Sequence, residues 1–305
     1  MLNETEYKYY KEYFFDNFIR ELEQREDKIY HYTNINGLEG ILKKDGAIWV
    51  SHADFLNDKT EIKYTMELST EIFLSLCEKR NFSQEKISKY QKLYVEAINI
   101  NDRMNTNYYS LSFSTNPDSN LLWANYSHND GYSITFDFDK LYSQLLYEMM
   151  ITNNVAIGSK VFYKQSVQRA KLSKLLNIII DNFEEKTKKE NYDVNKDELI
   201  LNAVGVLEWY SLFFKDECFS QEEEFRIALL YLNNNDSKIY DCRISNGTFI
   251  PYVKINFNRD SVREVTIGPK NNMDINKEGL SKFLQKHDYD LTKVSICKSE
   301  IPYRY

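Results

Sequence analysis

Residues 222–231 have the sequence EEEFRIALLY. Acidic residues precede an apolar run, a pattern that indicates the start of a β-strand. Alternate residues of a strand share a face, so Phe225 and Ile227 are expected to enter a core. Glu224 and Arg226 would then point together to the opposite side. The stretch therefore predicts a polar site at a strand start, and a solvated Glu–Arg pair is the alternative interpretation.

Composition indicates an ordinary soluble globular protein. The chain has 305 residues, of which 42% are hydrophobic and 28% charged. No apolar run approaches the roughly 20 residues of a membrane span. The first residues, MLNETE, lack a basic region followed by an apolar stretch, so we expect no secretory signal, no membrane and a cytoplasmic location. The net charge of -7 argues against a broad nucleic-acid-binding surface, although a local basic groove is compatible with it.

The cysteines and histidines do not form a recognisable metal-binding pattern. No Cys-x-x-Cys spacing occurs and the histidines are not clustered. We therefore expect neither a zinc site nor a disulfide framework, and no metal cofactor. The cysteines concerned are Cys77, Cys218, Cys242 and Cys297.

The hydrophobic periodicity predicts an α+β protein. Aromatic residues at helical spacing predict an amphipathic N-terminal helix within residues 1–27. No Gly/Ser/Pro-rich linker divides the remainder, so residues 28–305 are expected to form a single domain with helical insertions near 60–100 and 167–214. Helices are also predicted at residues 35–42, with Asn34 as the N-cap, and 273–286. Strands are predicted at residues 28–33, 47–51, 108–114, 131–137, 160–163, 224–231, 250–257, 262–267 and 293–297.

Polar residues recur on the predicted strands at three places. His31 with Thr33 lies on the first strand, and Glu224 with Arg226 on a later one. Between them, residues 108–114 alternate aromatic or aliphatic residues with serines. If these strands met, they could line one cleft in which His31 and Glu224 bind ribose hydroxyls. The alternative for His31 is a packed structural histidine.

The serine strand has a small polar face. Ser110, Ser112 and Ser114 share one side, while the opposite side carries Tyr109 and other large residues. Such a face leaves room for a ligand. The aromatic side chains that could stack on a ligand ring are Tyr32, Tyr109 and Trp123.

A metal-dependent nuclease is a competing interpretation. Asp54, Asp58 and the segment 61–63 (Glu-Ile-Lys) superficially resemble the Asp…Glu-x-Lys pattern of restriction-type nucleases. In such sites these residues lie on adjacent strands so that their oxygens converge on a cation. Here they fall within ten residues, across a loop and a helix start. Asp58 is better interpreted as an N-cap, with Glu61 completing a capping box.

Several short segments together carry a family resemblance. In order they are IYHYT (29–33), IW (48–49), LND (56–58) with Glu61, SFS (112–114), LWANY (122–126) with Gly131, EEEFR (222–226), IGP (267–269) and IPYR (301–304). Each is weak alone. Their order and spacing across residues 28–305 resemble the bacterial family of domains of unknown function numbered 2971.

The pattern of that family is similar to the ADP-ribosyltransferase fold, in which a small split sheet clasps NAD. The resemblance implies an α+β fold with a split, mixed or antiparallel sheet, and NAD as the substrate. The residues it implies for NAD binding are His31, Tyr32, Thr33, Tyr109, Ser112 and Trp123. Those it implies for catalysis are Glu224, Glu222 and Arg226, with Glu222 and Glu224 similar to the Glu-x-Glu arrangement of one transferase class. No middle-strand tyrosine is assigned, and Arg226 is more typical of the domain family than of transferases.

The implied chemistry is transfer of ADP-ribose to a macromolecule, in the manner of a toxin or a defence effector. Cleavage of the nicotinamide glycosidic bond builds positive charge on the ribose, which a carboxylate such as Glu224 would stabilise. The acceptor could be a protein side chain, a nucleic-acid base or water. The alternative is a non-catalytic module of the same fold that binds a nucleotide or a partner protein.

Overall fold

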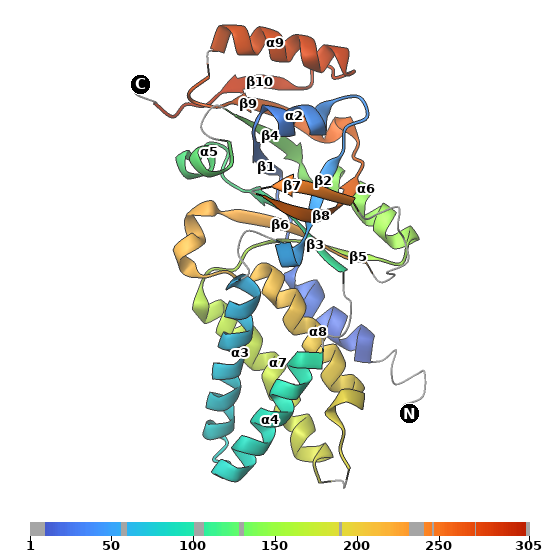
Figure 1. The fold of residues 1–305 in the computed structure, drawn as a ribbon, viewed down its shortest axis with the longest axis vertical. Helices are drawn as coiled ribbons and strands as arrows, with labels where there is room; N and C mark the ends of the chain where they lie inside the picture. The colour runs from blue at the N-terminus through green and yellow to red at the C-terminus, as the bar shows by residue number, and fades with distance from the viewer. Residues whose placement is uncertain are drawn as a thin grey trace. The chain divides into compact units, whose positions relative to one another are not determined.

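The computed structural model describes residues 10–55, 60–100, 107–127, 131–188, 191–231, 241–245, 247–271 and 273–302. The chain divides into two compact units, each built from three separate segments (Figure 1). The sheet unit comprises Gln24–Leu56, Tyr108–Lys160 and Ser220–Tyr305. The helical unit comprises Met1–Glu23, Asn57–Asn107 and Val161–Phe219. All of the predicted NAD-binding and catalytic residues belong to the sheet unit.

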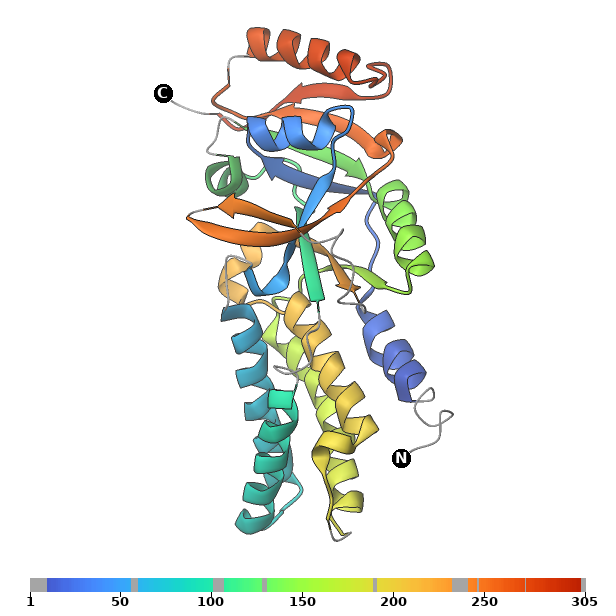
Figure 2. The ribbon, with the colours of Figure 1, turned by 45° about the vertical axis from the view of Figure 1, so that its right-hand side comes forward.

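The described part of the sheet unit forms one ten-stranded sheet. Its strands are β1 (Lys28–Thr33), β2 (Ile48–His52), β3 (Asn107–Ser114), β4 (Tyr132–Asp137), β5 (Val155–Lys160), β6 (Glu224–Tyr231), β7 (Asp241–Ser245), β8 (Thr248–Ile255), β9 (Val262–Ile267) and β10 (Ser295–Lys298). Their order is β10-β9-β4-β1-β3-β2-β8-β7, and β6 pairs with β3 and β5. β9 and β10 run parallel, whereas pairs such as β1–β4 and β2–β8 run antiparallel (Figure 2). The predicted α+β class and mixed sheet are therefore confirmed.

The sheet divides at β3. One end of β3 meets β1, where Tyr30 lies opposite Ser114. Its other end meets β2, where Ser51 lies opposite Ser110. Because β6 also pairs with β3, this serine strand is the junction of the sheet.

One face of the sheet is the apolar core of the unit. Phe225 and Leu229 are fully buried there, as the alternation in residues 222–231 predicts. Phe113 of β3 and Ile134 of β4 belong to the same core cluster. The helices of the unit are α2 (Ile35–Leu42), α5 (Asn120–Ser127), α6 (Phe138–Ile151) and α9 (Met273–Lys286). Its short helical turns are η3 (Ala53–Phe55), η7 (Arg259–Ser261) and the second half of η6 (Glu217–Glu222), whose first three residues belong to the helical unit.

Local signals predicted several of these elements correctly. Asn34 caps α2, since its side-chain oxygen accepts a hydrogen bond from the Gly37 N–H at 2.9 Å. The bounds of β9 and α9 also agree with the expected ranges. The strand expected at 160–163 is wrong in position. β5 ends at Lys160 because residues 155–160 pair with β6, whereas Phe162 makes only an isolated bridge to Phe214.

The helical unit gathers the predicted helical insertions and the N-terminal helix. Its elements are α3 (Thr60–Lys79), α4 (Gln84–Ile100), α7 (Gln165–Lys186), α8 (Glu198–Phe213), the turn η5 (Val194–Lys196) and helical residues 10–22, which include η1 (Phe15–Ile19) and η2 (Arg20–Leu22). Phe14 and Phe18 are buried, as the helical spacing predicts. Residues 1–9 of the predicted N-terminal helix lie outside the described residues.

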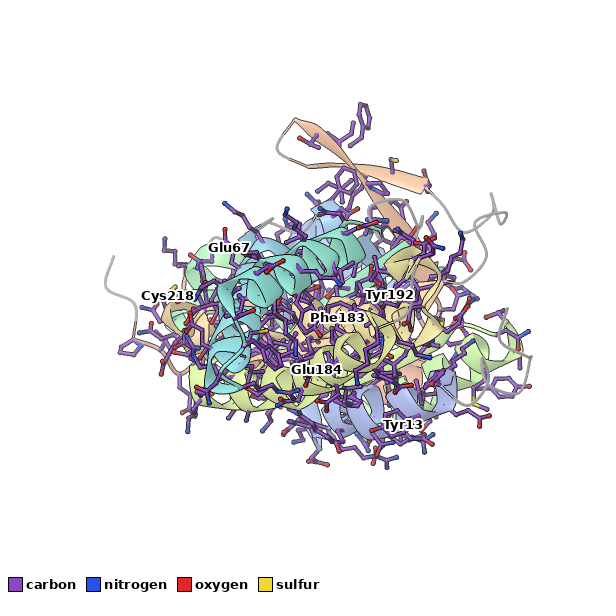
Figure 3. The ribbon with its side chains drawn as sticks, turned by 90° about the horizontal axis from the view of Figure 1, so that it is seen from below. Tyr13, Glu67, Phe183, Glu184, Tyr192 and Cys218 are labelled. Carbon is purple, nitrogen blue, oxygen red and sulfur yellow. The ribbon has the colours of Figure 1, made fainter. Side chains whose placement is uncertain are left out.

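Aromatic side chains pack against one another inside the helical unit; Figure 3 labels two of them, Phe183 and Tyr192. Phe73 and Tyr94 stack with ring centroids 4.5 Å apart. Phe183 lies against both Phe73 and Tyr192, at centroid distances of 6.3 Å in each case. These contacts join α3, α4 and α7, so the two insertions pack with one another through buried rings.

Candidate functional site

Three strands that carry predicted site residues, β1, β3 and β6, are neighbours in the sheet. His31 Nδ1 donates a hydrogen bond to the Ser112 carbonyl oxygen at 3.2 Å. Ser114 Oγ donates to the Glu222 carbonyl oxygen at 2.9 Å. Segments that are far apart in the chain are therefore joined at β3 by side chains as well as by strand pairing.

His31 lies on the core side of the sheet. Its ring packs edge-on against Phe113, with centroids 5.8 Å apart. Phe113 is a core residue, and its neighbour Ser112 points to the other face. The side chains of His31 and Glu224 are consequently on opposite faces of the sheet, although their strands both adjoin β3. The expectation that His31 and Glu224 line one cleft is therefore wrong, because the pairing of Tyr30 with Ser114 turns His31 towards the core. Thr33 lies next to His31 on β1 and packs against Gly37, where an added Cβ would come within 1.9 Å of Thr33 Oγ1.

The environment of His31 predicts a pH-dependent stability. Burial lowers the pKa of His31 below its ordinary value of 6.5, and the bond to Ser112 only partly opposes this. The unfolded chain then binds the proton first, so stability is complete above pH 6.5 and falls as the pH drops below it. The slope is at most about 1.4 kcal/mol per pH unit. Thermal unfolding between about pH 5 and 8 should show this slope in the parent and a smaller one in His31→Gln; equal slopes would contradict the assignment.

Tyr32 and Trp123 hold the turn at residues 116–119. The Tyr32 hydroxyl donates to the Asn116 carbonyl at 2.9 Å and accepts from the Ser119 N–H at 3.0 Å. Burial raises the pKa of this hydroxyl, which therefore stays protonated. The Trp123 ring lies 4.8 Å from that of Tyr32 and is fully enclosed. Both residues meet the turn after β3, and Trp123 has no exposed surface for a ligand ring.

Asp118 in this turn was not among the predicted site residues. It accepts hydrogen bonds from Trp123 Nε1, Ser299 Oγ and the Glu300 N–H, each at 2.7 Å. It thereby joins α5 to the segment after β10. The run Asn116-Pro-Asp-Ser is a turn signal from which a local role could have been inferred, but its remote partners could not.

Tyr109 also belongs to the core side. It is buried and makes edge contacts with His52 and Tyr231, at centroid distances of 5.1 and 5.5 Å. The exposed member of the predicted serine face is Ser112, whereas Ser110 is buried. Tyr109 and Ser112 therefore face opposite sides of β3.

Glu224 and Arg226 form a buried, bidentate ion pair. Arg226 Nε lies 2.6 Å from Glu224 Oε1, and Nη2 lies 2.9 Å from Oε2. Exposed fractions are 6% for Glu224 and 3% for Arg226. The two side chains point together as predicted, but they are enclosed rather than solvated. Two parallel charge-assisted bonds are what makes burial of both charges tolerable.

The two preceding glutamates are more accessible. Glu222 is half-buried, and its Oε1 accepts a hydrogen bond from the Tyr126 hydroxyl at 3.3 Å. Glu223 is exposed and has a positive φ of 45°, which is uncommon for a residue with a side chain. Its carbonyl oxygen accepts a hydrogen bond from the Thr115 N–H at 2.8 Å, and its Oε1 accepts one from Asn116 Nδ2, also at 2.8 Å. The start of β6 thus stores backbone strain, as functional segments often do.

The pattern that suggested a nuclease is only partly described. Asp54 lies in η3, but Asp58 lies outside the described residues, as does the side chain of Glu61. Lys63 pairs with Glu67 at 3.5 Å. Within the described ranges, no group of three or more His, Cys, Asp and Glu side chains is placed to bind a metal ion. In those same ranges, no helix has both the length and the apolar character of a membrane span.

In comparisons with known proteins, one family model matches about a third of the chain. No curated protein and no solved structure matches it. A family model does match, in agreement with the family resemblance of the sequence. The matched residues, 122–227, include Trp123, Glu222, Glu224 and Arg226, and the family is described as a protein of unknown function (DUF2971).

Proposed function

We propose that the protein uses NAD to transfer ADP-ribose to a macromolecular acceptor, a protein or a nucleic acid. The observation that carries the proposal is the junction at β3, where β1, β3 and β6 meet. Bonds from His31 to Ser112 and from Ser114 to Glu222 join the three strands. The adjacency of a histidine strand and a Glu-x-Glu strand supports the resemblance to ADP-ribosyltransferases. The position of His31 on the core side does not support it, and the proposal therefore gives His31 no contact with the ribose.

The reaction would need one accessible carboxylate. The bond between nicotinamide nitrogen and ribose C1′ breaks, and its electron pair leaves with nicotinamide. The acceptor nucleophile then bonds to C1′ and loses its proton. A carboxylate beside the ribose stabilises the positive charge that develops in between.

We assign this role to Glu222 rather than to Glu224. Glu222 is the last residue of η6, two residues before β6, and it is half-buried with its carboxylate beside Tyr126. Both oxygens of Glu224 bind Arg226, and the pair is enclosed. Glu224 then supports the site by fixing the start of β6, and its carboxylate does not contact the ribose.

Glutamine variants of the three consecutive glutamates test this assignment. We expect Glu222→Gln to bind NAD yet to release nicotinamide on the order of a hundredfold more slowly, because it keeps the shape and loses the charge. Glu223→Gln is the matched control, since Glu223 is adjacent and exposed, and it should keep most of the activity. Glu224→Gln should lower the melting temperature. Nicotinamide release with cell lysate as the acceptor source measures activity.

The outcome for Glu224→Gln can contradict the assignment. If Glu224→Gln keeps the melting temperature of the parent but loses NAD turnover, and Glu222→Gln keeps NAD turnover, Glu224 is the catalytic carboxylate. If all three variants turn over NAD like the parent, the carboxylate mechanism at the start of β6 is wrong.

A non-catalytic binding module is the second candidate. It is favoured by the enclosure of Glu224 and by the position of His31 on the opposite face from it. This candidate expects NAD binding by calorimetry without nicotinamide release with any acceptor. Nicotinamide release by the parent protein would exclude it.

A further inference from the structure

A second polar surface continues from β3 in the other direction, across β2, β8 and β7. In register across these four strands lie Ser110, Ser51, Tyr252 and Asp241. Directly paired residues share a face, so this row lies on the face of Ser110 and away from the apolar core. Ser112 and Glu224 share that face, because their neighbours Phe113 and Phe225 belong to the core cluster. We call the surface formed by β2, β8 and β7 on this side the hairpin face; the β7–β8 hairpin is orange in Figure 2.

Arg243 of β7 lies on the hairpin face, on the same side of its strand as Asp241. Its Nη2 donates to Ser51 Oγ at 3.1 Å, reaching over β8. Of the described residues, none supplies a carboxylate within ion-pair distance of it, whereas Arg226 pairs with Glu224 and Arg263 with Asp137. Arg243 is half-buried, and burial lowers the pKa of its guanidinium. A partly desolvated cation without a counter-charge is costly and favours a bound anion.

Hydroxyl groups accompany this guanidinium. Ser51 Oγ receives the bond from Arg243, and Ser110 lies directly opposite Ser51. Ser110 Oγ is buried and has no hydrogen-bond partner within the described structure. Buried polar atoms without a partner are uncommon and call for a physical account. A guanidinium with adjacent hydroxyl donors matches the oxygens of a phosphate group.

An aromatic platform lies beside these donors. Trp49 precedes Ser51 by two residues on the same face of β2, about 7 Å along the strand. Its indole stacks on Tyr252 with centroids 4.5 Å apart, yet 47% of the residue remains exposed. Lys254 lies opposite Trp49 and adds a second cation to the face. The acid of this face, Asp241, is engaged by Tyr252 Oη at 3.1 Å and by Lys254 at 3.9 Å.

We propose that the hairpin face binds the phosphate-bearing part of a nucleotide, with the phosphates on Arg243 and Ser51 and the base on the exposed indole of Trp49. The inference rests on the proposed function in one respect: the nucleotide is then the ADP half of NAD, whose ribose end extends along β3 towards the start of β6. The protein has a net charge of -7, so binding of an anionic phosphate needs cations close to the site. Stacking on tryptophan tolerates any base, so the phosphates carry most of the selectivity.

Calorimetry with ADP and adenosine tests the inference directly. We expect the parent to bind ADP on the order of tenfold or more tightly than adenosine, because adenosine lacks the phosphates. Arg243→Ala should weaken ADP binding by a similar factor and leave adenosine binding unchanged. Trp49→Ala should weaken both ligands. Arg263→Ala is the matched control, since Arg263 lies in the same unit but is paired with Asp137, and it should bind ADP like the parent.

Thermal unfolding of each variant and nicotinamide release by the parent complete the test. Equal binding of ADP by Arg243→Ala and the parent, at equal melting temperature, overturns the inference, as does absence of ADP binding to the parent at about millimolar concentration. Loss of ADP binding in Arg243→Ala without any NAD turnover by the parent supports the phosphate site and rejects the transferase. If the parent turns over NAD and Arg243→Ala has the same KM for NAD, the transferase is supported and the phosphate site on Arg243 is rejected.

Discussion

Arg226→Met is expected to lower the free energy of unfolding by about 3–5 kcal/mol, because it leaves the buried Glu224 carboxylate without its counter-charge. The two side chains are bound to each other at 2.6 and 2.9 Å and are almost fully enclosed. Methionine keeps much of the length and apolar volume of the arginine stem. Denaturant titration of the purified protein measures the loss.

Two further variants make this prediction specific to the buried pair. Glu224→Leu combined with Arg226→Met removes both charges and should recover most of the lost stability. Arg263→Met is the control, because the pair of Arg263 with Asp137 is more exposed and such pairs contribute at most about 1 kcal/mol. Parent-like unfolding of the Arg226→Met variant would show that the pair does not stabilise the fold.

Trp123→Ala is expected to cost about 3–5 kcal/mol, the range for loss of a large buried aromatic side chain. The side chain has no exposed surface, packs against Tyr32 and donates to Asp118. The variant should also loosen the turn after β3, since Asp118 loses one of its donors. Trp123→Phe keeps most of the ring volume and should lose less stability than the alanine variant.

The exposed Trp49 provides the contrast for this prediction. Trp49→Ala should change the free energy of unfolding much less, because almost half of that residue is exposed. Its expected effect is on nucleotide binding. If Trp123→Ala unfolds like the parent but loses NAD binding, Trp123 contacts the ligand directly and the enclosed position described above is not the one that operates in solution.

Local patterns were sufficient for much of the sheet unit. The alternation in residues 222–231 predicted both the burial of Phe225 and the paired direction of Glu224 and Arg226. It could not predict that this pair is enclosed, since burial depends on what packs over the strand. α6 and β7 were not predicted at all. β7 is short, and its regularity comes from pairing with β8 rather than from its own residues.

For the candidate site too, the sequence predicted individual residues but not which of them are brought into contact. The sequence identified His31, Ser112 and Glu224 as polar residues on three strands, and these strands do adjoin one another at β3. The Arg243–Ser51 contact carried no sequence signal, because the two residues are 192 positions apart. Loop lengths between such segments reveal nothing about which edges of a sheet they join.

By itself, therefore, the sequence determined which residues of one strand share a face, because the pleat alternates with a period of two. Only the tertiary structure decided how the faces of different strands correspond. Tyr30 lies opposite Ser114, which places His31 beside Phe113 on the core side. A shift of one residue in that register would have placed His31 with Ser112 and Glu224 instead. Register is set by long-range pairing and by the burial of Phe113 and its core neighbours, and neither is encoded in the spacing of residues along one strand.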